Sequence, residues 1–468
     1  IGNDERLAAV IEDYLPDFVS TLRNVNRVVP VFVFYLEHYI KQTGSQSNNN
    51  GGDKTQRSLE VNPGDLLALE LLRFFDTEVH NRIPACKSIL SNWGQAPSLA
   101  SDIKKEVLEH LLAPLERDET NSPPEWDPAR DDRAKDMLFF LFPHLREDAE
   151  FVLGTENDQY RRRVSHPEMF DRYFERRIPD SALLKGQIEA LLDAAQREDE
   201  VGNLFSDLVS QSDSRRVISA LDSRLDVLRR GDELSRTQIQ SLLTTLFDEG
   251  DELKSFSTAG FEMPESELAV GLIQTLLRQY LSSVEERGAV LLNALTSTSG
   301  LYLPARVVQG AIRENRRRLK YRPPLYKISD LDQAVSVFAK KVEDAATSGD
   351  LTEQRHMQRI FHAWHRYGFR DEALDWIEDE STKSTEGFFR CLEAFNVASS
   401  RDQMIQTYHQ SEEEGAPFSL DGEYLNSLGL LEIFADAKKQ VDTNDLSQRQ
   451  HRMIAELRRV NEAIIKQK

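Results

Sequence analysis

Apolar residues recur three and four positions apart along almost the whole chain, and this spacing limits the possible fold more than any other feature of the sequence. It places apolar side chains on one face of an α-helix, whereas a half-buried strand needs apolar and polar residues to alternate. Such alternation is almost absent. The stretch 28–36 is ambiguous, because its β-branched and aromatic residues suit a buried strand as well as a helix. A lone strand would lack a pairing partner, so we interpret it as a helix and predict an all-α fold without substantial sheet.

The chain is long enough for several hydrophobic cores. Its 468 residues exceed the roughly 100 to 200 residues of one domain, and 40% of them are hydrophobic. Glycine-rich or proline-rich breaks are found at 41–58, 117–130, 179, 263–264, 303–304 and 323–324. After the second break, the helical pattern resumes near Ala134. We therefore expect an array of helical bundles in five segments: a lid-like helical segment at 1–45, a flexible loop at 46–58, a helical domain at 59–180, a second bundle at 181–325 and a repeat-like helical interaction region at 326–468.

Charge and cysteine usage exclude several classes of protein. The net charge of −21 repels nucleic acid unless basic groups are concentrated locally. Cys86 and Cys391 are the only two cysteines, and their wide separation within helical patterns argues against a disulfide or a zinc site. No apolar run approaches the roughly 20 residues that cross a bilayer. We expect reduced thiols, a cytoplasmic location and no membrane span. The first residue is Ile1 and no secretory signal precedes the first helix, which leaves open that the chain is part of a longer one.

The clearest helix covers 62–75 and is predicted to be a core element. Asn62 is suited to cap its N-terminus, and Pro63 fits the first turn. The leucines that follow form a wide apolar stripe.

No complete catalytic site is recognisable. The glycines at 51–52 precede a lysine and a threonine, but they lack the spacing and the strand-to-helix context of a phosphate-binding loop. His362 and His365 lie on one helical face, yet no acidic residue stands at the spacing of a zinc protease, so we interpret them as packing or solvated residues. We expect no metal site and no enzymatic activity of this chain alone.

Three groups of basic residues are candidate ligand contacts. Arg23 and Arg27 are four positions apart, so they project from one helical face, where they could clamp a phosphate or pair with nearby carboxylates. A second group precedes a helix that we expect to be capped by Ser165 and to bury aromatic residues. The third is the densest cluster, at 313–322, and suits either acidic helices of the same chain or a nucleic acid or nucleotide. The candidate phosphate or partner contacts in the second and third groups are Arg161, Arg162, Arg163, Arg313, Arg316, Arg317 and Arg318.

Several of these segments resemble the C-terminal region of KAP-family P-loop NTPases. The stretch 21–27 resembles the family's Thr-Pro-Arg-x-x-x-Arg helix, with Leu22 in place of the proline. The stretch 65–75 resembles its DLLALE-type helix, and 162–174 its basic stretch ahead of a Phe-Asp-Arg-Tyr-Phe helix. Upstream of the latter, 141–143 is similar to the family's Leu-Phe-Pro. The blocks follow the family's order and cover about residues 1 to 180.

The resemblance implies an ATPase whose nucleotide core, with its phosphate loop and magnesium-binding acid, precedes Ile1. ATP and Mg are then implied cofactors, while none is expected in this chain itself. Family members include bacterial antiphage-defence proteins. Arg23 matches the lid arginine that senses the terminal phosphate in related NTPases, and Arg27 is the second candidate for nucleotide sensing.

Two main hypotheses of function follow, and a third is nucleic-acid binding by the arginine cluster at 313–322. In the first, the chain is the lid and helical C-terminal part of a KAP-like ATPase and couples nucleotide state to a partner or effector. In the second, it is a stand-alone helical scaffold that binds proteins through its aromatic-rich tail. The expected partners are proteins or an effector subunit, with nucleic acid only through 313–322, no membrane, and homo-oligomerisation left open.

Overall fold

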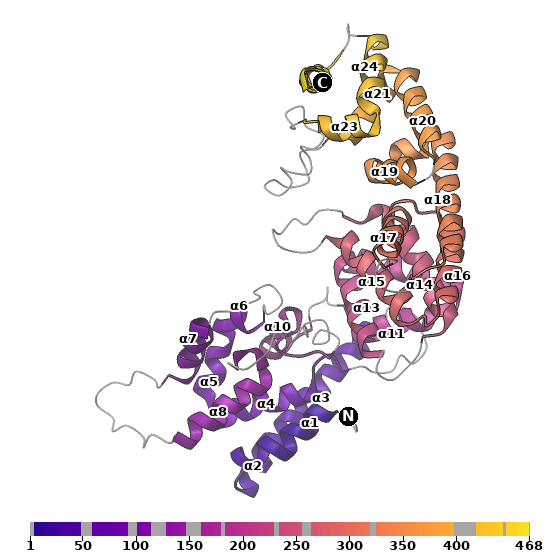
Figure 1. Ribbon diagram of the computed structural model, residues 1–468. Helices are drawn as coiled ribbons and strands as arrows, with labels where there is room; N and C mark the ends of the chain where they lie inside the picture. Colours follow the sequence, from indigo (N-terminus) through magenta and orange to yellow (C-terminus); the bar gives the residue numbers. More distant parts are fainter. Residues whose placement is uncertain are drawn as a thin grey trace. The chain divides into compact units, whose positions relative to one another are not determined.

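The computed structural model confirms the all-α prediction (Figure 1). The residues it describes are 4–47, 59–91, 101–113, 128–146, 161–178, 183–228, 234–254, 264–318, 324–367, 369–396, 418–442 and 446–467. Within these ranges the chain forms helices and no strand, and the β-type pairing is limited to an isolated bridge between Asn396 and Leu420. None of the helices in these ranges combines the length and the apolar character that a bilayer crossing requires.

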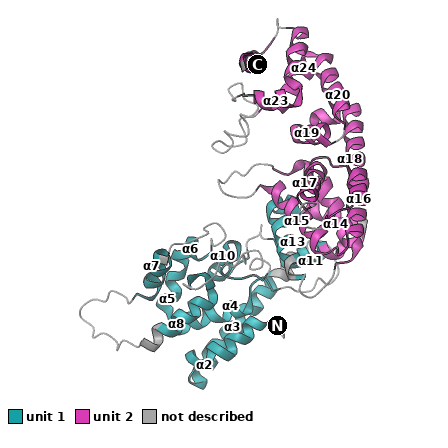
Figure 2. Ribbon diagram, viewed as in Figure 1, with its two compact units in different colours: residues 1–191, 208–232 teal, residues 192–207, 233–468 magenta. Residues whose placement is uncertain are grey.

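The chain folds into two compact units (Figure 2). Unit 1 comprises Ile1–Leu191 and Leu208–Asp232, and unit 2 comprises Leu192–Asp207 and Glu233–Lys468. The five predicted segments stay a prediction. Three helices lie where the sequence passes between the units: α11 (Lys185–Ala194), α12 (Glu198–Gln211) and α13 (Ser214–Leu228).

Unit 1 is built around α4, as the leucine-rich pattern predicts. Its other helices are α1 (Glu5–Ala9), the π-helix η1 (Val10–Tyr14), α2 (Leu15–Phe18), α3 (Leu22–Ser47), α5 (Thr77–Arg82), η3 (Ile83–Cys86), α6 (Lys87–Leu90), α7 (Ser101–Leu112), α8 (Pro128–Leu141), η5 (Pro143–Leu145) and α10 (Pro167–Glu175). Helix α4 covers Pro63–Phe75, and the Asn62 side chain accepts hydrogen bonds from the backbone N–H groups of Gly64 and Asp65. Every residue from Pro63 to Leu72 is buried. A Cβ on Gly64 would lie 2.8 Å from the carbonyl carbon of Arg6, so the close approach of α1 to α4 requires glycine.

In unit 2, each helix packs mainly on helices one or two places away along the chain. The helices are α14 (Arg236–Glu249), η6 (Gly250–Glu252), α15 (Glu265–Gln279), α16 (Val284–Ser297), α17 (Tyr302–Arg318), α18 (Ile328–Ser348), η7 (Asp350–Glu353), α19 (Met357–Tyr367), α20 (Arg370–Lys383), α21 (Thr385–Ala394), α23 (Gly422–Leu428), α24 (Leu430–Ala437), η8 (Lys438–Gln440) and α25 (Gln448–Gln467). Phe361, Trp364, Phe388 and Phe395 are buried. The result is an array of short helices with a continuous apolar interior.

The structure corrects three predicted boundaries. The loop predicted from residue 41 is wrong over 41–47, where α3 continues to Ser47, while 48–58 lies outside the described residues. The side chain of Gln42 accepts a hydrogen bond from the backbone N–H of Ile178 at 3.0 Å, so a tertiary contact helps to hold this end of the helix. Helix α8 begins at Pro128 and not near Ala134. Pro304 lies in the first turn of α17, where its missing N–H costs no hydrogen bond, so the break falls just before it.

Candidate functional site

Two fully buried carboxylates, Glu60 and Asp65, organise the polar interior of unit 1. Glu60 lies just before α4 and binds the guanidinium groups of Arg162 at 3.2 Å and Arg172 at 3.1 Å. It also accepts a hydrogen bond from the backbone N–H of Lys185 at 2.9 Å. Because a buried charge is stable only when it is paired and hydrogen-bonded, these contacts join the start of α4 to α10 and the start of α11.

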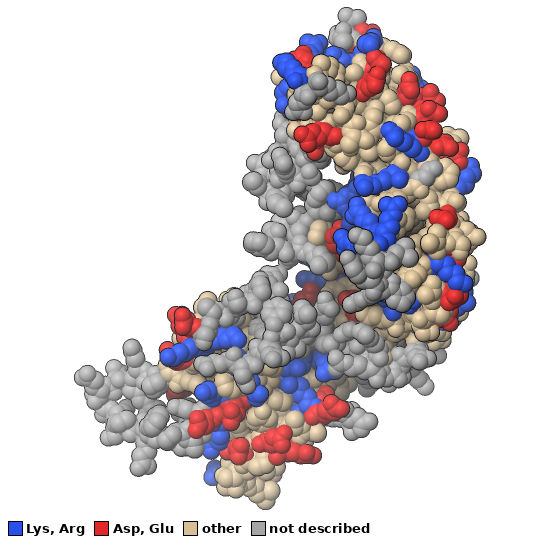
Figure 3. Space-filling model, in the orientation of Figure 1, with Lys and Arg blue, Asp and Glu red and all other residues tan. Residues whose placement is uncertain are grey.

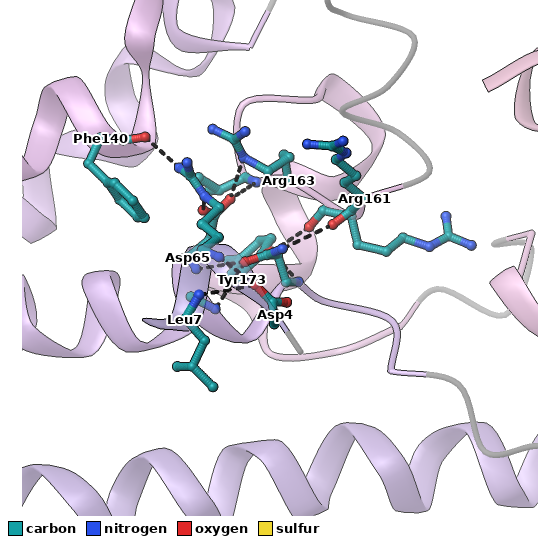
Figure 4. A network of polar contacts seen from close by, with 12 residues as sticks. Asp4, Leu7, Asp65, Phe140, Arg161, Arg163 and Tyr173 are labelled. Carbon is teal, nitrogen blue, oxygen red and sulfur yellow. Dashed lines mark hydrogen bonds and ion pairs between the residues drawn. The ribbon is translucent and has the colours of Figure 1, made fainter. Parts of the chain in front are cut away.

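Asp65 forms the second half of this interior, and Figure 4 shows the contacts around it. We call the contacts of Glu60 and Asp65 together the buried ion-pair network. It accepts hydrogen bonds from the backbone N–H of Val164 at 2.8 Å and from Nε of Arg163 at 3.3 Å. Nε of Arg6, from α1, also pairs with it. Arg6 in turn donates to the carbonyl oxygen of Phe140 and lies 3.7 Å from the centre of the Phe140 ring. One carboxylate thus connects α1, α4, α8 and the segment before α10.

Two tyrosine hydroxyls complete the network. Tyr173 donates to the carbonyl oxygen of Arg162 and accepts from the backbone N–H of Asn62 at 2.7 Å. Burial, together with the charge of Asp65, raises the pKa of the Tyr173 phenol well above its usual value. Tyr39 of α3 donates to the carbonyl oxygen of Arg172 at 2.5 Å. Arg162 is held with φ of 56°, which side chains other than glycine rarely adopt. These bonds stabilise that backbone conformation.

The three arginines of the predicted basic group at 161–163 therefore lie in two different environments. Arg162 and Arg163 are only 4% and 9% exposed and belong to the buried ion-pair network, whereas Arg161 is exposed. A contact of this group with phosphate or a partner stays a prediction, and the geometry of Arg162 and Arg163 favours a structural role.

The prediction that Ser165 caps α10 is wrong. His166 precedes α10, and its ring accepts a hydrogen bond from the backbone N–H of Glu168 at 3.3 Å. Burial, and then the charges of Arg162 and Arg172, lowers the pKa of His166 to about 3.

The two arginines predicted to sense nucleotide lie on an exposed face of α3. Arg23 and Arg27 are both exposed, and within the described ranges neither forms the ion pair that was the alternative interpretation. The guanidinium of Arg27 lies 5.6 Å from the centre of the Phe74 ring. Apolar neighbours on the same helix are exposed too: Leu22 at 74% and Phe34 at 62%, with Val25, Val29 and Val33 at 36–42%.

The cluster on α17 is also exposed, at Arg313, Arg316 and Arg317. Arg318 ends the helix, and its side chain and residues 319–323 lie outside the part that the structure describes. Within that part, the three exposed arginines form no ion pair, although their neighbours do: Arg306 with Glu267, and Arg278 with Glu314 at 3.9 Å. Docking onto acidic helices of the same chain therefore finds no support among the described residues.

The histidines are used for packing and hydrogen bonding. His362 contacts the hydroxyl of Tyr424 at 3.1 Å through Nδ1, and the two rings are stacked with centres 5.7 Å apart. His365 is buried, and His356 contacts the carbonyl oxygen of Leu253 at 2.8 Å through Nε2. Among the described residues no group of histidine, cysteine and acidic side chains is arranged to hold a metal. Both cysteines are buried and free.

Sequence reasoning missed Glu60, Asp65, Arg6 and Arg172. A signal for one of them existed, since Asp65 is an acidic residue in a helix whose other residues are mostly apolar. Its partners carry no such signal, because Arg6 and Arg163 are far from it in the sequence and only the tertiary structure brings them together.

Fold and sites define a class: an all-α protein of several helical bundles, with a buried ion-pair network in one unit and an exposed basic helix in the other. Comparison of the chain with protein-family models, with curated proteins and with solved structures finds no match in any of the three.

Proposed function

We propose that this chain is the lid and helical C-terminal part of a KAP-like P-loop ATPase. It couples ATP binding and hydrolysis, carried out with Mg by a core outside this chain, to the regulation of a protein partner or effector in bacterial antiphage defence. The observation that carries the proposal is the exposed start of α3, where exposed Arg23 follows exposed Leu22, the first residue of an apolar stripe.

The apolar stripe on α3 is regular. Leu22, Val25, Val29 and Val33 are spaced by three and four residues and therefore lie along one side of α3. Adjacent exposed apolar residues of this kind mark an interaction surface. The nucleotide-binding core is the occupant that we propose, because docking there would bring the neighbouring Arg23 to a phosphate.

Arg23 has the properties that this role demands. It is exposed, and within the described ranges it has no acidic partner that would neutralise its charge. A guanidinium at the terminal phosphate of ATP stabilises the charge that develops during hydrolysis. Loss of that phosphate removes the contact, and such a difference between two states is the basis of coupling.

Other side chains of α3 connect it to the rest of unit 1. Val28 and Tyr39 are buried, and Tyr39 reaches the backbone of Arg172 in the buried ion-pair network. The four sequence blocks that resemble the KAP family also gather in this unit: α3 packs on α4, α4 holds Arg163 through Asp65, and the rings of Phe142 and Phe170 lie 6.4 Å apart. This common packing supports one structural role for the four blocks.

The scaffold alternative receives less support. It places protein binding on the aromatic-rich tail, in which Phe361, Trp364, Phe388 and Phe395 are buried against one another and their neighbours. They form the interior of the tail.

The test is ATP turnover by the protein as its gene encodes it, together with any subunits that copurify. Arg23→Ala should lower turnover by about 100-fold or more, as removal of a transition-state arginine does. Arg177→Ala is the matched control, because Arg177 is an exposed arginine of the same unit and lies on no such apolar face. Equal turnover of the Arg23 variant and the control would refute the proposed role of Arg23.

A further inference from the structure

Exposed arginines on two packed helices form a basic surface on unit 2. Arg313, Arg316 and Arg317 of α17 and Arg366 of α19 are all exposed, and α17 packs on α19. We call these four residues the α17–α19 basic surface. In Figure 3, blue side chains gather where Figure 1 shows these two helices. None of the four has an acidic partner within the described ranges, so their charges are available to a ligand.

Their arrangement does not stabilise the helix that carries them. Residues three and four positions apart are neighbours on a helix surface, with Cβ atoms about 5–6 Å apart, and like charges there repel. Arg313 stands in this relation to both Arg316 and Arg317. The helix dipole offsets part of the repulsion, because the last two lie near the C-terminus of α17. The helix dipole does not explain why an arginine stands at 313, or why Arg366 stands on the second helix.

The helices that carry the surface are firmly held. Between two of the arginines, Asn315 is buried. Its side chain donates to the carbonyl oxygen of Tyr326 at 2.7 Å and accepts from the backbone N–H of Leu325 at 2.9 Å. The chain after α17 is thereby attached to the helix, and the arginines are presented from a fixed support.

Two arginines of this surface act on a nearby histidine, His362. Burial is the main cause that lowers the pKa of His362, and the charges of Arg366, His365 and Arg313 add to it. Arg366 and Arg313, from different helices, therefore act on one imidazole.

We propose that the α17–α19 basic surface binds the phosphate backbone of a nucleic acid. Planar guanidinium groups match phosphate oxygens in paired hydrogen bonds, and every cation of the surface is an arginine. The half-buried ring of His362 lies near Arg366 and Arg313 and stacks on the half-buried ring of Tyr424, and rings of this kind are ones on which bases stack. The rest of this acidic chain repels a polyanion and so directs it to this surface.

Two other polyanionic partners fit less well. The large hydrophobic side chains that are exposed in the described ranges lie elsewhere, at Ile11, Ile103, Ile328, Ile465 and on α3. The basic surface thus has no apolar anchor to enter a lipid bilayer. It also has no apolar centre of the kind that protein interfaces surround with a polar rim. A surface made of arginines alone suits a phosphate backbone best.

The experiment is fluorescence anisotropy of a short labelled single-stranded oligonucleotide with the intact chain at increasing salt. Four phosphate contacts predict that the logarithm of affinity falls with the logarithm of salt with a slope of about −3. The double variant Arg313→Gln with Arg317→Gln should bind about tenfold more weakly or worse, and its slope should be shallower by about 1.4. The double variant Arg177→Gln with Arg458→Gln removes the same charge from exposed positions outside the surface and should bind like the parent.

A second readout separates binding from damage to the fold. Bound phosphate should raise the pKa of His362, followed by NMR, because it neutralises Arg366 and Arg313. The proposal is overturned if the parent chain does not bind at low salt, if binding is independent of salt, or if both double variants lose affinity equally. Binding to polyglutamate or to anionic lipid vesicles, with none to the oligonucleotide, would also overturn it. None of these outcomes depends on ATP turnover, so the proposal stands or falls separately from the role of Arg23.

Discussion

Three consecutive arginines occur twice in this chain, at 161–163 and at 316–318, and the two runs have opposite environments. In unit 1, Arg162 and Arg163 are buried and paired with Glu60 and Asp65. In unit 2, Arg316 and Arg317 are exposed and have no acidic partner in the described ranges. The difference teaches that a run of basic residues does not by itself identify a ligand site. The role of such a run depends on whether the fold brings buried carboxylates to it from elsewhere in the chain.

The largest expected effect comes from removing a carboxylate of the buried network. Asp65→Asn leaves Arg6 and Arg163 near a neutral side chain, and breaking a buried ion pair in this way costs about 3–5 kcal/mol. Urea unfolding followed by circular dichroism measures the loss. Asp436→Asn is the control, since Asp436 pairs with Lys439 on the surface, and it should cost less than about 1 kcal/mol. Similar losses in the two variants would show that the network does not stabilise unit 1.

A smaller loss is expected from the hydroxyl that joins α4 to the arginine segment. Tyr173→Phe keeps the buried ring but removes the bonds to the carbonyl oxygen of Arg162 and the N–H of Asn62. The N–H of Asn62 and the carbonyl oxygen of Arg162 still bond to each other at 3.1 Å, so the variant loses two hydrogen bonds to the hydroxyl, each worth about 0.5–1.5 kcal/mol. The same urea titration measures it, with Tyr367→Phe in unit 2 as a control of the substitution. A neutral Tyr173→Phe would mean that Arg162 holds its backbone conformation without this bond.

Acid should weaken unit 2 through His356. Its pKa is about 4 when folded, mainly because of burial, against about 6.5 when unfolded. Between pH 6.5 and pH 4, His356 therefore binds a proton in the unfolded chain but not in the folded chain. The free energy of unfolding falls as the pH falls through this range. At about pH 5.5 the loss is on the order of 1 kcal/mol. His356→Gln should flatten the dependence of unfolding on pH, whereas the same change at exposed His451 should not. A parent chain equally stable over this range would contradict the assignment.

The smallest effect on stability is expected on the basic surface. Arg316→Gln with Arg317→Gln removes repulsion between neighbouring charges and breaks no ion pair in the described ranges, so unfolding should change by about 0.5 kcal/mol or less. Thermal unfolding monitored by circular dichroism measures it. A loss of several kcal/mol, comparable with Asp65→Asn, would abolish the contrast between the two arginine runs.

Much of the fold could be predicted, because local patterns specify helices. The cap at Asn62 and the leucines after it placed α4 correctly, and the stretch 28–36 is helical as expected. Two local predictions failed, one because of a contact with a distant residue and one by a single position. Residues 41–47 have a loop-like composition, yet Gln42 is bonded to Ile178, and the imidazole of His166 caps α10 in place of the expected Ser165.

The candidate sites were less predictable than the helices. Sequence spacing identified the arginine groups, but it could not distinguish burial from exposure. Asp65 and Arg163 are 98 residues apart in the sequence, and no local pattern relates them. Whether a residue such as Arg23 is exposed depends on which surfaces the packed chain leaves uncovered. Sequence spacing does not specify this.

The central claim, that this chain works with a P-loop ATPase core, is tested most directly by native mass spectrometry of the protein purified from its own cells. We predict either a polypeptide substantially heavier than the 53.6 kDa of these residues that contains the core, or a second ATPase subunit bound to the chain. A polypeptide of 53.6 kDa with no ATPase bound would contradict the claim.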